Sequence, residues 1–277
     1  MNKTHFHINE IGWQNFADKE WSKLRWKELL NRKQGDSKEF VFGLAELSAG
    51  ERLPLHTHSQ AETDFILSGN ARVRLGIRSV ELGPASAVYF LGKKPHSIET
   101  LGSEPLRYIF TYACEKLGHT LNWELADERI AALVNIRNMD KSRWAISEEF
   151  EEWLPWEPSK GFKMRYKILF DQEHGNCQEM VWGTCELDPG VHYTLHYHDQ
   201  PEIYYVIVGR GIVYAGDSKV EVSSGMAVYL PGQVVHGADC FGEEPLHMCW
   251  ILGAETVGQN VNWTPVEDIY TEVRVSK

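Results

Sequence analysis

The feature that most limits the fold of this chain is an internal repeat. A shift of 140 residues aligns two long segments without a gap, from Arg25–Lys27 against Arg165–Lys167 to Asn122–Trp123 against Asn262–Trp263. Identical residues between these ends pair Gly43 with Gly183, Gly50 with Gly190, Gly69 with Gly209, and Ala87–Tyr89 with Ala227–Tyr229. Two copies of one unit fold alike, so each copy constrains the prediction for the other. We therefore predict two domains of the same fold, at residues 1–125 and 126–277.

Each copy consists of short runs of branched and aromatic residues separated by turn residues. In the first copy these runs are Phe65–Leu67, Ala71–Leu75, Val88–Phe90 and Tyr108–Phe110. The second copy repeats them at Tyr204–Val208, Gly211–Tyr214, Val228–Leu230 and His247–Leu252. Many short strands at regular spacing are typical of an all-β sandwich or barrel. The predicted fold class is therefore all-β.

Two segments require a choice between helix and strand. Residues Trp21–Leu30, followed by Gly35, have the pattern of a helix with a glycine cap. Their repeat partner, Phe162–Phe170, alternates polar and apolar residues like a strand, so we predict strands for both. A helix is predicted instead at Glu124–Val134, with Asn122 as a candidate cap, and it would connect the two copies.

The charge balance and the hydropathy exclude several classes of protein. The chain has 28 Lys and Arg against 39 Asp and Glu, a net charge of −11, and its cations are scattered, which argues against nucleic acid as a partner. No run reaches the roughly 18 apolar residues of a membrane helix, and the N-terminus lacks the apolar centre of a signal peptide. We expect a soluble, cytoplasmic protein without a membrane partner. The five cysteines show no C-x-x-C spacing and are expected to be buried, reduced thiols.

Each copy also holds a set of three histidines and one glutamate at the same spacing. The two sets are His56, His58, Glu62 and His96, and His196, His198, Glu202 and His236. His-x-His on a strand places both imidazoles on one face, because side chains alternate along a strand. Three neutral imidazoles and a carboxylate suit a divalent transition metal (Fe, Mn, Ni, Co or Zn) and leave about two positions of an octahedron open. We predict one metal site in each domain, with room for substrate, water or oxygen.

These residues are part of a longer motif. The pattern Gly-x5-His-x-His-x3-Glu-x6-Gly, followed by a segment that ends in histidine, resembles the cupin superfamily, and its double occurrence resembles a bicupin. The resemblance covers roughly residues 40 to 115 and 180 to 255. It implies two tandem cupin barrels (double-stranded β-helix or jelly roll) with a short helical connection. Because many cupins dimerise, it also allows a homodimer.

The second cupin motif, Gly-x5-Pro-x-Gly-x2-His, is only partly kept. The second copy has Gly225, Pro231 and His236, but its inner glycine lies one position early, at Gly232. In the first copy the outer glycine and the proline are replaced by Ala85 and Leu91, whereas Gly92 and His96 remain. This departure is expected to alter the loop before His96 and the chemistry of the first site more than its fold.

The two copies differ two residues after the glutamate, on the same face of the strand. Tyr204 in the second copy can act as a general base or orient a substrate, and a bound cation would lower the pKa of its phenol; it can also be core. Asp64 in the first copy can act as acid or base, or hydrogen-bond to a ligand histidine. The run Glu202–Val206 resembles cupin-type dimethylsulfoniopropionate lyases, in which the metal is thought to hold the substrate carboxylate while a tyrosine removes the neighbouring proton. Tyr89, Tyr229, Met248 and Trp250 can line the cavities or belong to the core.

Three functions remain open. The leading hypothesis is a metal-dependent enzyme that acts on a small carboxylate- or carbonyl-bearing molecule, with the metal as Lewis acid and proton abstraction as the chemical step, hence a lyase or isomerase. An iron-dependent dioxygenase would use the same ligands and bind oxygen at an open position. The third is a non-catalytic small-molecule binding protein, although the presence of two full ligand sets favours catalysis.

Overall fold

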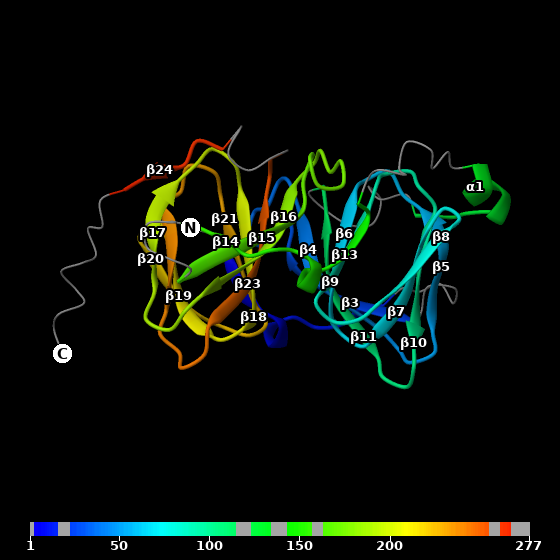
Figure 1. The fold of residues 1–277 in the computed structure, drawn as a ribbon, viewed down its shortest axis with the longest axis horizontal. Helices are drawn as coiled ribbons and strands as arrows, with labels where there is room; N and C mark the ends of the chain where they lie inside the picture. Colours follow the sequence, from blue (N-terminus) through cyan, green and yellow to red (C-terminus); the bar gives the residue numbers. More distant parts are fainter. Residues whose placement is uncertain are drawn as a thin grey trace.

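The computed structural model describes residues 3–15, 23–114, 123–133, 143–156, 163–254 and 261–266. These residues form two β-barrels that lie next to each other, each built from a seven-stranded and a five-stranded antiparallel sheet (Figure 1). The prediction of an all-β fold is confirmed. No helix within these ranges is long and apolar enough to cross a membrane. All five cysteines are free thiols, and four of them are buried.

The N-terminal barrel is formed mainly by residues 24–125. Its large sheet has the order β13 (Ala145–Ser147), β9 (Ser86–Phe90), β6 (Glu62–Ser68), β11 (Leu106–Tyr112), β4 (Val41–Leu47), β3 (Leu24–Leu30) and β2 (Gln14–Asn15). Its small sheet has the order β12 (Glu124–Leu125), β5 (Arg52–Thr57), β10 (His96–Leu101), β7 (Asn70–Leu75) and β8 (Arg78–Leu82). Alternating residues of both sheets face a shared apolar core.

The C-terminal barrel repeats this arrangement. Its large sheet has the order β1 (His5–His7), β21 (Met226–Leu230), β18 (Glu202–Val208), β23 (Leu246–Leu252), β16 (Val181–Leu187), β15 (Met164–Phe170) and β14 (Leu154–Pro155). Its small sheet has the order β20 (Ser218–Ser223), β19 (Arg210–Ala215), β22 (His236–Cys240), β17 (His192–Tyr197) and β24 (Thr264–Pro265). The strands predicted for the two ambiguous segments are confirmed as β3 and β15.

The helix predicted at Glu124–Val134 is shorter than expected. Glu124 and Leu125 form β12, which pairs with β5, and the helix α1 covers only Glu128–Leu133. The pairing with β5 overrides the helical propensity of these two residues, because it extends the small sheet. The carboxylate of Asp127 accepts a hydrogen bond from the backbone of Arg129 (2.7 Å), so Asp127 caps the helix. Asn122 and Val134 lie outside the described residues.

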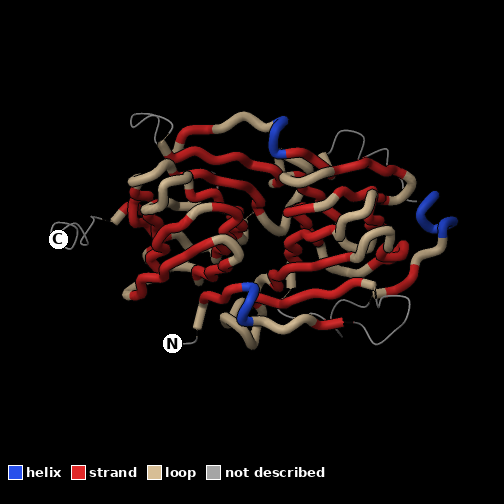
Figure 2. The backbone as a smooth tube through the Cα atoms, turned by 90° about the horizontal axis from the view of Figure 1, so that it is seen from below, coloured by secondary structure: helices blue, strands red, loops and turns tan. Residues whose placement is uncertain are grey.

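The two barrels exchange their first strands. β1 belongs to the N-terminal part of the chain but pairs with β21, whereas β13 follows the first copy and pairs with β9. The registers correspond, since His5 faces Val228 and Ala145 faces Val88. The structural repeat thus begins well before Arg25, and Figure 2 shows the N-terminal segment against the C-terminal barrel before it crosses to the other. The predicted domain boundary at residues 125 and 126 stays a prediction.

A large apolar core joins the facing surfaces of the two large sheets. Phe65 of one barrel stacks on Trp182 of the other, with ring centroids 5.3 Å apart. Tyr89 donates a hydrogen bond to Glu179 (2.8 Å), and its repeat partner Tyr229 donates one to Glu39 (2.8 Å). Of the four residues considered as cavity walls, Tyr89 and Tyr229 therefore belong to the core between the barrels.

A buried carboxylate adds a polar contact to this junction. Glu148, in the 3-10 turn η3 (Glu148–Phe150), accepts a hydrogen bond from the hydroxyl of Thr184 (2.8 Å) and lies 3.2 Å from Nε2 of His247. Burial alone would raise the pKa of Glu148, but His247, Thr184 and the charge of Lys167 outweigh it and hold this pKa below its usual range. The ionised carboxylate therefore contributes to the stability of the folded state.

Replacement of Glu148 by glutamine is expected to destabilise the protein in a pH-dependent manner. A pKa that is lower in the folded than in the unfolded state contributes stability above the unfolded value of about 4.3, and this stability is lost as the pH falls through the folded value. At pH 7 we expect Glu148→Gln to lower the free energy of unfolding by about 1 to 3 kcal/mol, the range for hydrogen bonds to charged groups. Urea unfolding at pH 7 and near pH 4 checks this, with the exposed neighbour Glu149→Gln as control. An equal loss at both pH values would contradict the role of the ionised carboxylate.

Candidate metal centres

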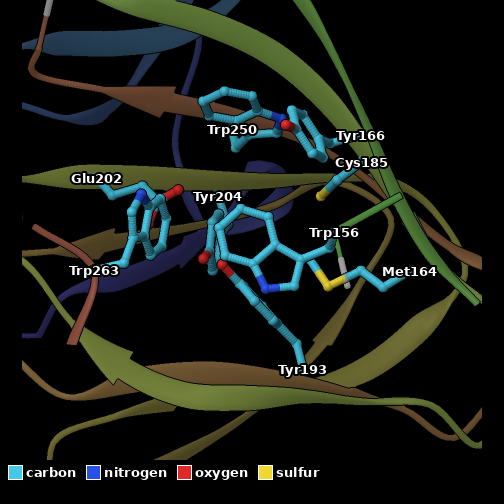
Figure 3. Close-up of a pocket in the computed structure, with 9 residues that line it drawn as sticks. All are labelled: Trp156, Met164, Tyr166, Cys185, Tyr193, Glu202, Tyr204, Trp250 and Trp263. Atoms are coloured by element: carbon cyan, nitrogen blue, oxygen red, sulfur yellow. The ribbon is translucent and has the colours of Figure 1, made fainter. Parts of the chain in front are cut away.

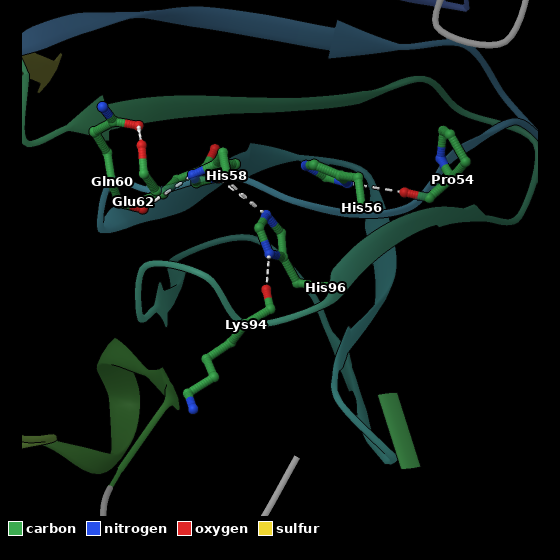
Figure 4. Close-up of polar contacts among 8 residues, drawn as sticks. Pro54, His56, His58, Gln60, Glu62, Lys94 and His96 are labelled. Carbon is green, nitrogen blue, oxygen red and sulfur yellow. Dashed lines mark hydrogen bonds and ion pairs between the residues drawn. The ribbon is translucent and has the colours of Figure 1, made fainter. Parts of the chain in front are cut away.

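The structure brings each predicted set of four residues together inside its barrel. His56 lies on β5, His58 just after it, Glu62 at the start of β6 and His96 at the start of β10 (Figure 4). The second set occupies the matching places on β17, β18 and β22. Within each set, one nitrogen or oxygen atom from every residue lies within 4.8 Å of the others, and all eight side chains are buried.

All six imidazoles are oriented by hydrogen bonds to backbone carbonyls. In the N-terminal cluster, Nδ1 donates to the carbonyl of Pro54, Gln60 or Lys94 at 2.8 to 2.9 Å. In the C-terminal cluster the acceptors are the carbonyls of Thr194, Gln200 and Val234, again at 2.8 to 2.9 Å. A proton on Nδ1 leaves the lone pair of Nε2 free to face the centre of the cluster, as in metal-ligating histidines.

The charge states follow from burial and from contacts within the clusters. Burial lowers the pKa of His56 well below 6.5 and that of His196 to about 3, so both rings are neutral. Burial alone would raise the pKa of Glu202, but hydrogen bonds from His198 and His236 lower it to about 2. The oxygen Oε2 of Glu202 lies 3.0 Å from Nε2 of His236. Neutral imidazoles with an ionised carboxylate form a donor set that fits a divalent metal such as Mn in both barrels.

The loop before the last histidine is the same in both barrels. A side chain at Gly92 would place its Cβ 2.2 Å from the carbonyl oxygen of Ser59, and Gly232 has the same close approach to Asp199 (2.0 Å). The next residues, Lys93 and Gln233, take positive φ angles of 64° and 67°.

The contacts of this loop also correspond. The backbone N–H of Lys93 donates to the carbonyl of His58 (2.6 Å), as that of Gln233 does to His198 (2.7 Å). The expectation that Ala85 and Leu91 alter the loop before His96 is therefore wrong, because these hydrogen bonds and the glycine contact determine its shape. Lys94 contributes a carbonyl to the cluster, and its ammonium group points away (Figure 4).

A tryptophan that was not predicted as a site residue covers each cluster. Trp123 stacks on His56, with centroids 4.9 Å apart and an interplanar angle of 27°. Trp263 lies 4.5 Å from the ring of His196 and 4.7 Å from that of His198. The matched Asn-Trp pairs at the end of the repeat were the signal that could have identified these residues.

The C-terminal cluster borders a cavity of about 340 Å³ (Figure 3). It is lined by Trp156, Met164, Tyr166, Cys185, Tyr193, Glu202, Tyr204, Trp250 and Trp263. Tyr204 is almost fully buried, and its hydroxyl has no hydrogen-bond partner of good geometry within the described ranges. Burial, followed by the charge of Glu202, raises the pKa of this phenol well above 10 in the metal-free protein. Trp250 also lines the cavity, whereas Met248 belongs to the core.

The matching positions of the N-terminal barrel hold different side chains. Leu24, Ala45, Leu53, Asp64 and Phe110 replace Met164, Cys185, Tyr193, Tyr204 and Trp250, and all five are buried. Burial and the neighbouring charge of Glu62 raise the pKa of Asp64 well above its usual value. Asp64 makes no hydrogen bond of good geometry to a described residue, so its predicted contact with a ligand histidine is not seen. The aromatic cavity wall is therefore a feature of the C-terminal repeat.

Curated relatives match part of the chain. Dimethylsulfoniopropionate lyase DddW of Ruegeria pomeroyi is 33% identical over 81 residues, which are 29% of this chain and 53% of that protein. The uncharacterized protein MJ1618 of Methanocaldococcus jannaschii is 38% identical over 53 residues, 19% of this chain and 42% of that protein. The matched regions thus span about half the length of these relatives.

Solved structures match almost the whole chain. A variant of oxalate decarboxylase OxdC from Bacillus subtilis has a TM-score of 0.74 at 17% identity and covers 96% of this chain and 80% of its own. The formate complex of the Lactobacillus farciminis oxalate decarboxylase has a TM-score of 0.75 at 18% identity and covers 96% and 89%. Another structure of the Bacillus subtilis enzyme is described with Mn(II) centres. At these identities the likeness establishes the fold.

The family itself is evident from both halves of the chain. The family model described as "Cupin domain" matches residues 43–112 and again residues 183–252. Both segments contain the first three residues of a cluster, and the fourth histidine lies within them as well. The chain belongs to the cupin family and is a bicupin, with one cluster of three histidines and one glutamate in each of its two cupin domains.

Proposed function

We propose that the C-terminal barrel is a metal-dependent active site that removes a proton from the carbon next to a carboxylate or carbonyl group of a small molecule. The observation that carries this proposal is the hydroxyl of Tyr204. It is buried, lacks a hydrogen-bond partner among the described residues, and belongs to a cavity that Glu202 of the metal cluster also lines. A buried, unpaired hydroxyl costs free energy, and this cost is explained if a substrate supplies the partner.

The residues divide the chemistry among them. His196, His198, Glu202 and His236 would hold the metal. When bound, a divalent metal supplies a Lewis acid that acidifies the carbon next to a coordinated carboxylate or carbonyl. Tyr204 then accepts the proton at its phenolic oxygen. Loss of a leaving group from the next carbon makes the reaction a lyase reaction, and return of the proton elsewhere makes it an isomerisation.

The cavity wall argues against the substrate named for the structural neighbours. Oxalate carries two carboxylates, and a second carboxylate needs cationic or donor groups when it leaves water. The nine residues of the wall include no lysine and no arginine. A molecule with one carboxylate and an apolar or cationic remainder fits better, as dimethylsulfoniopropionate, the compound in the name of the partial relative, illustrates.

Proton exchange tests the proposal directly. Protein loaded with Mn, Fe, Ni, Co or Zn is incubated in D₂O with a panel of small carboxylates that includes dimethylsulfoniopropionate and oxalate. We expect deuterium next to the carboxylate, or elimination products, for at least one monocarboxylate and none for oxalate. Oxygen consumption by the iron form without exchange would favour the dioxygenase, and binding without turnover would favour a non-catalytic binding protein.

A further inference from the structure

The cavity of the C-terminal barrel has two chemically different ends. In Figure 3, Glu202 and Trp263 lie at one end and Met164 and Cys185 at the other, with Trp156 between them. Trp263 contacts the rings of the cluster histidines. We call the part formed by Met164, Tyr166, Cys185 and Trp250 the far end. A ligand whose carboxylate reaches the metal cluster would place its remaining atoms there.

Aromatic faces surround this space at steep angles to one another. Trp156 meets Tyr166 at 71°, with centroids 5.8 Å apart, and meets Tyr193 at 83° and 5.2 Å. Tyr166 meets Trp250 at 73° and 6.2 Å. Rings at right angles present their faces from several sides, and each face carries the negative part of the ring quadrupole. This arrangement is an aromatic cage.

The cage is held in place without a ligand. The indole N–H of Trp250 donates to the carbonyl of Thr184 (3.1 Å), which fixes the plane of the ring. Gly183 allows this position, because a Cβ there would lie 2.5 Å from Cζ2 of Trp250. A preorganised wall loses little conformational entropy when it binds a ligand.

The charges around the far end also favour a cation. No lysine or arginine lines the cavity, and the cations of β15, Arg165 and Lys167, lie over the ring of Trp153 instead. The thiol of Cys185 responds to its surroundings accordingly. Burial raises its pKa, and the charges of Glu202, Glu186 and Glu148 raise it further. A negative potential thus reaches the far end.

We propose that the far end binds a permanent organic cation, a quaternary ammonium or a sulfonium group, on a ligand whose carboxylate faces the metal cluster. The carboxylate half of this statement rests on the proposed function, whereas the cation half rests on the cage alone. A permanent cation fits better than a primary ammonium, because ammonium N–H groups leaving water need acceptors that ring faces and a thioether replace poorly. The methyl groups of an onium ion need only contact.

A pair of isosteric ligands tests the cation half. Choline and 3,3-dimethylbutan-1-ol have the same shape but differ in charge, so a simple apolar cavity does not prefer choline. With metal-loaded protein, titration calorimetry and tryptophan fluorescence are expected to show saturable choline binding about tenfold tighter than binding of the neutral alcohol. Equal affinity for the two ligands, or no saturable choline binding, would overturn the proposal.

Variants locate the binding. Trp250→Leu is expected to abolish the preference for choline, whereas Phe110→Leu, at the matched position of the N-terminal barrel, keeps it. Thermal melting checks that both fold, and Tyr166→Leu replaces Trp250→Leu if the latter does not, because Tyr166 is less buried. A preference for choline that survives both Trp250→Leu and Tyr166→Leu rules out the cage.

Tyr204→Phe separates the two proposals, because it keeps the ring and removes the hydroxyl. This variant is expected to bind choline like the parent protein and to lose proton exchange. Exchange in the parent protein without a preference for choline would overturn only the cage. A preference for choline without exchange on any carboxylate of the panel would overturn only the proposed function.

Discussion

Replacement of His196 by alanine is expected to remove one metal equivalent and to lower turnover of a substrate by at least about a thousandfold. A Lewis acid contributes several kcal/mol to the stabilisation of the transition state, and each 1.4 kcal/mol corresponds to a factor of ten. His196 comes from the cluster that borders the aromatic cavity. Metal content by elemental analysis and initial rates on the same preparation measure both effects.

His56→Ala is the matched variant in the other barrel. It is expected to remove the other metal equivalent and to lower the melting temperature, with a much smaller loss of turnover, because the cavity with Tyr204 lies in the C-terminal barrel. Metal bound to the native state stabilises it by mass action, so removal of either ligand is also visible in thermal melting. A larger loss of turnover for His56→Ala than for His196→Ala would place catalysis in the N-terminal barrel.

Replacement of Tyr204 by phenylalanine is expected to lower kcat by about two to four orders of magnitude, the usual contribution of a positioned acid or base. Metal content should stay at the parent level, because the hydroxyl is not one of the four clustered ligand atoms. KM should change little, since the aromatic ring remains. Steady-state kinetics together with elemental analysis separate loss of a proton acceptor from loss of the metal.

Tyr205→Phe is the control for this substitution. Tyr205 follows Tyr204 on β18, is equally buried, and points to the other side of the sheet, where it packs on Phe42 at the junction of the barrels (5.6 Å between centroids). Its loss of a hydroxyl should affect stability but not kcat. If both variants lowered kcat to the same extent, the effect would be structural and Tyr204 would not be the base.

Several features of the fold follow directly from sequence patterns. Alternation of side chains along strands and the agreement between two copies predicted the strands, including β3, whose own residues favour a helix. Agreement between the copies was decisive there, since Met164–Phe170 has no such ambiguity. The repeat upstream of Arg25 was missed because the paired residues differ: Ile8 corresponds to Glu148, and both accept a lysine hydrogen bond through their backbone carbonyls.

The candidate site was predictable to different depths. The two sets of four residues followed from spacing alone, because His-x-His on a strand and a glutamate at the start of the next are local relations. The tryptophans over the clusters were not predicted, since Trp123 and Trp263 reach them from separate strands that close each barrel. The role of Trp250 in a cavity, and of Met248 in the core, also required the packed structure.

The sequence by itself determined the duplication, the all-β class and the two sets of three histidines and one glutamate, because these depend on periodicity within a strand and on identity between copies. Only the tertiary structure decided that β1 and β13 are exchanged, that Tyr89 and Tyr229 join the barrels, and that aromatic rings meet around a cavity in one barrel. The physical reason is the range of the interactions. Strand pairing and ring contacts join residues that are distant in the chain, and their partners are chosen by the packing of the whole molecule.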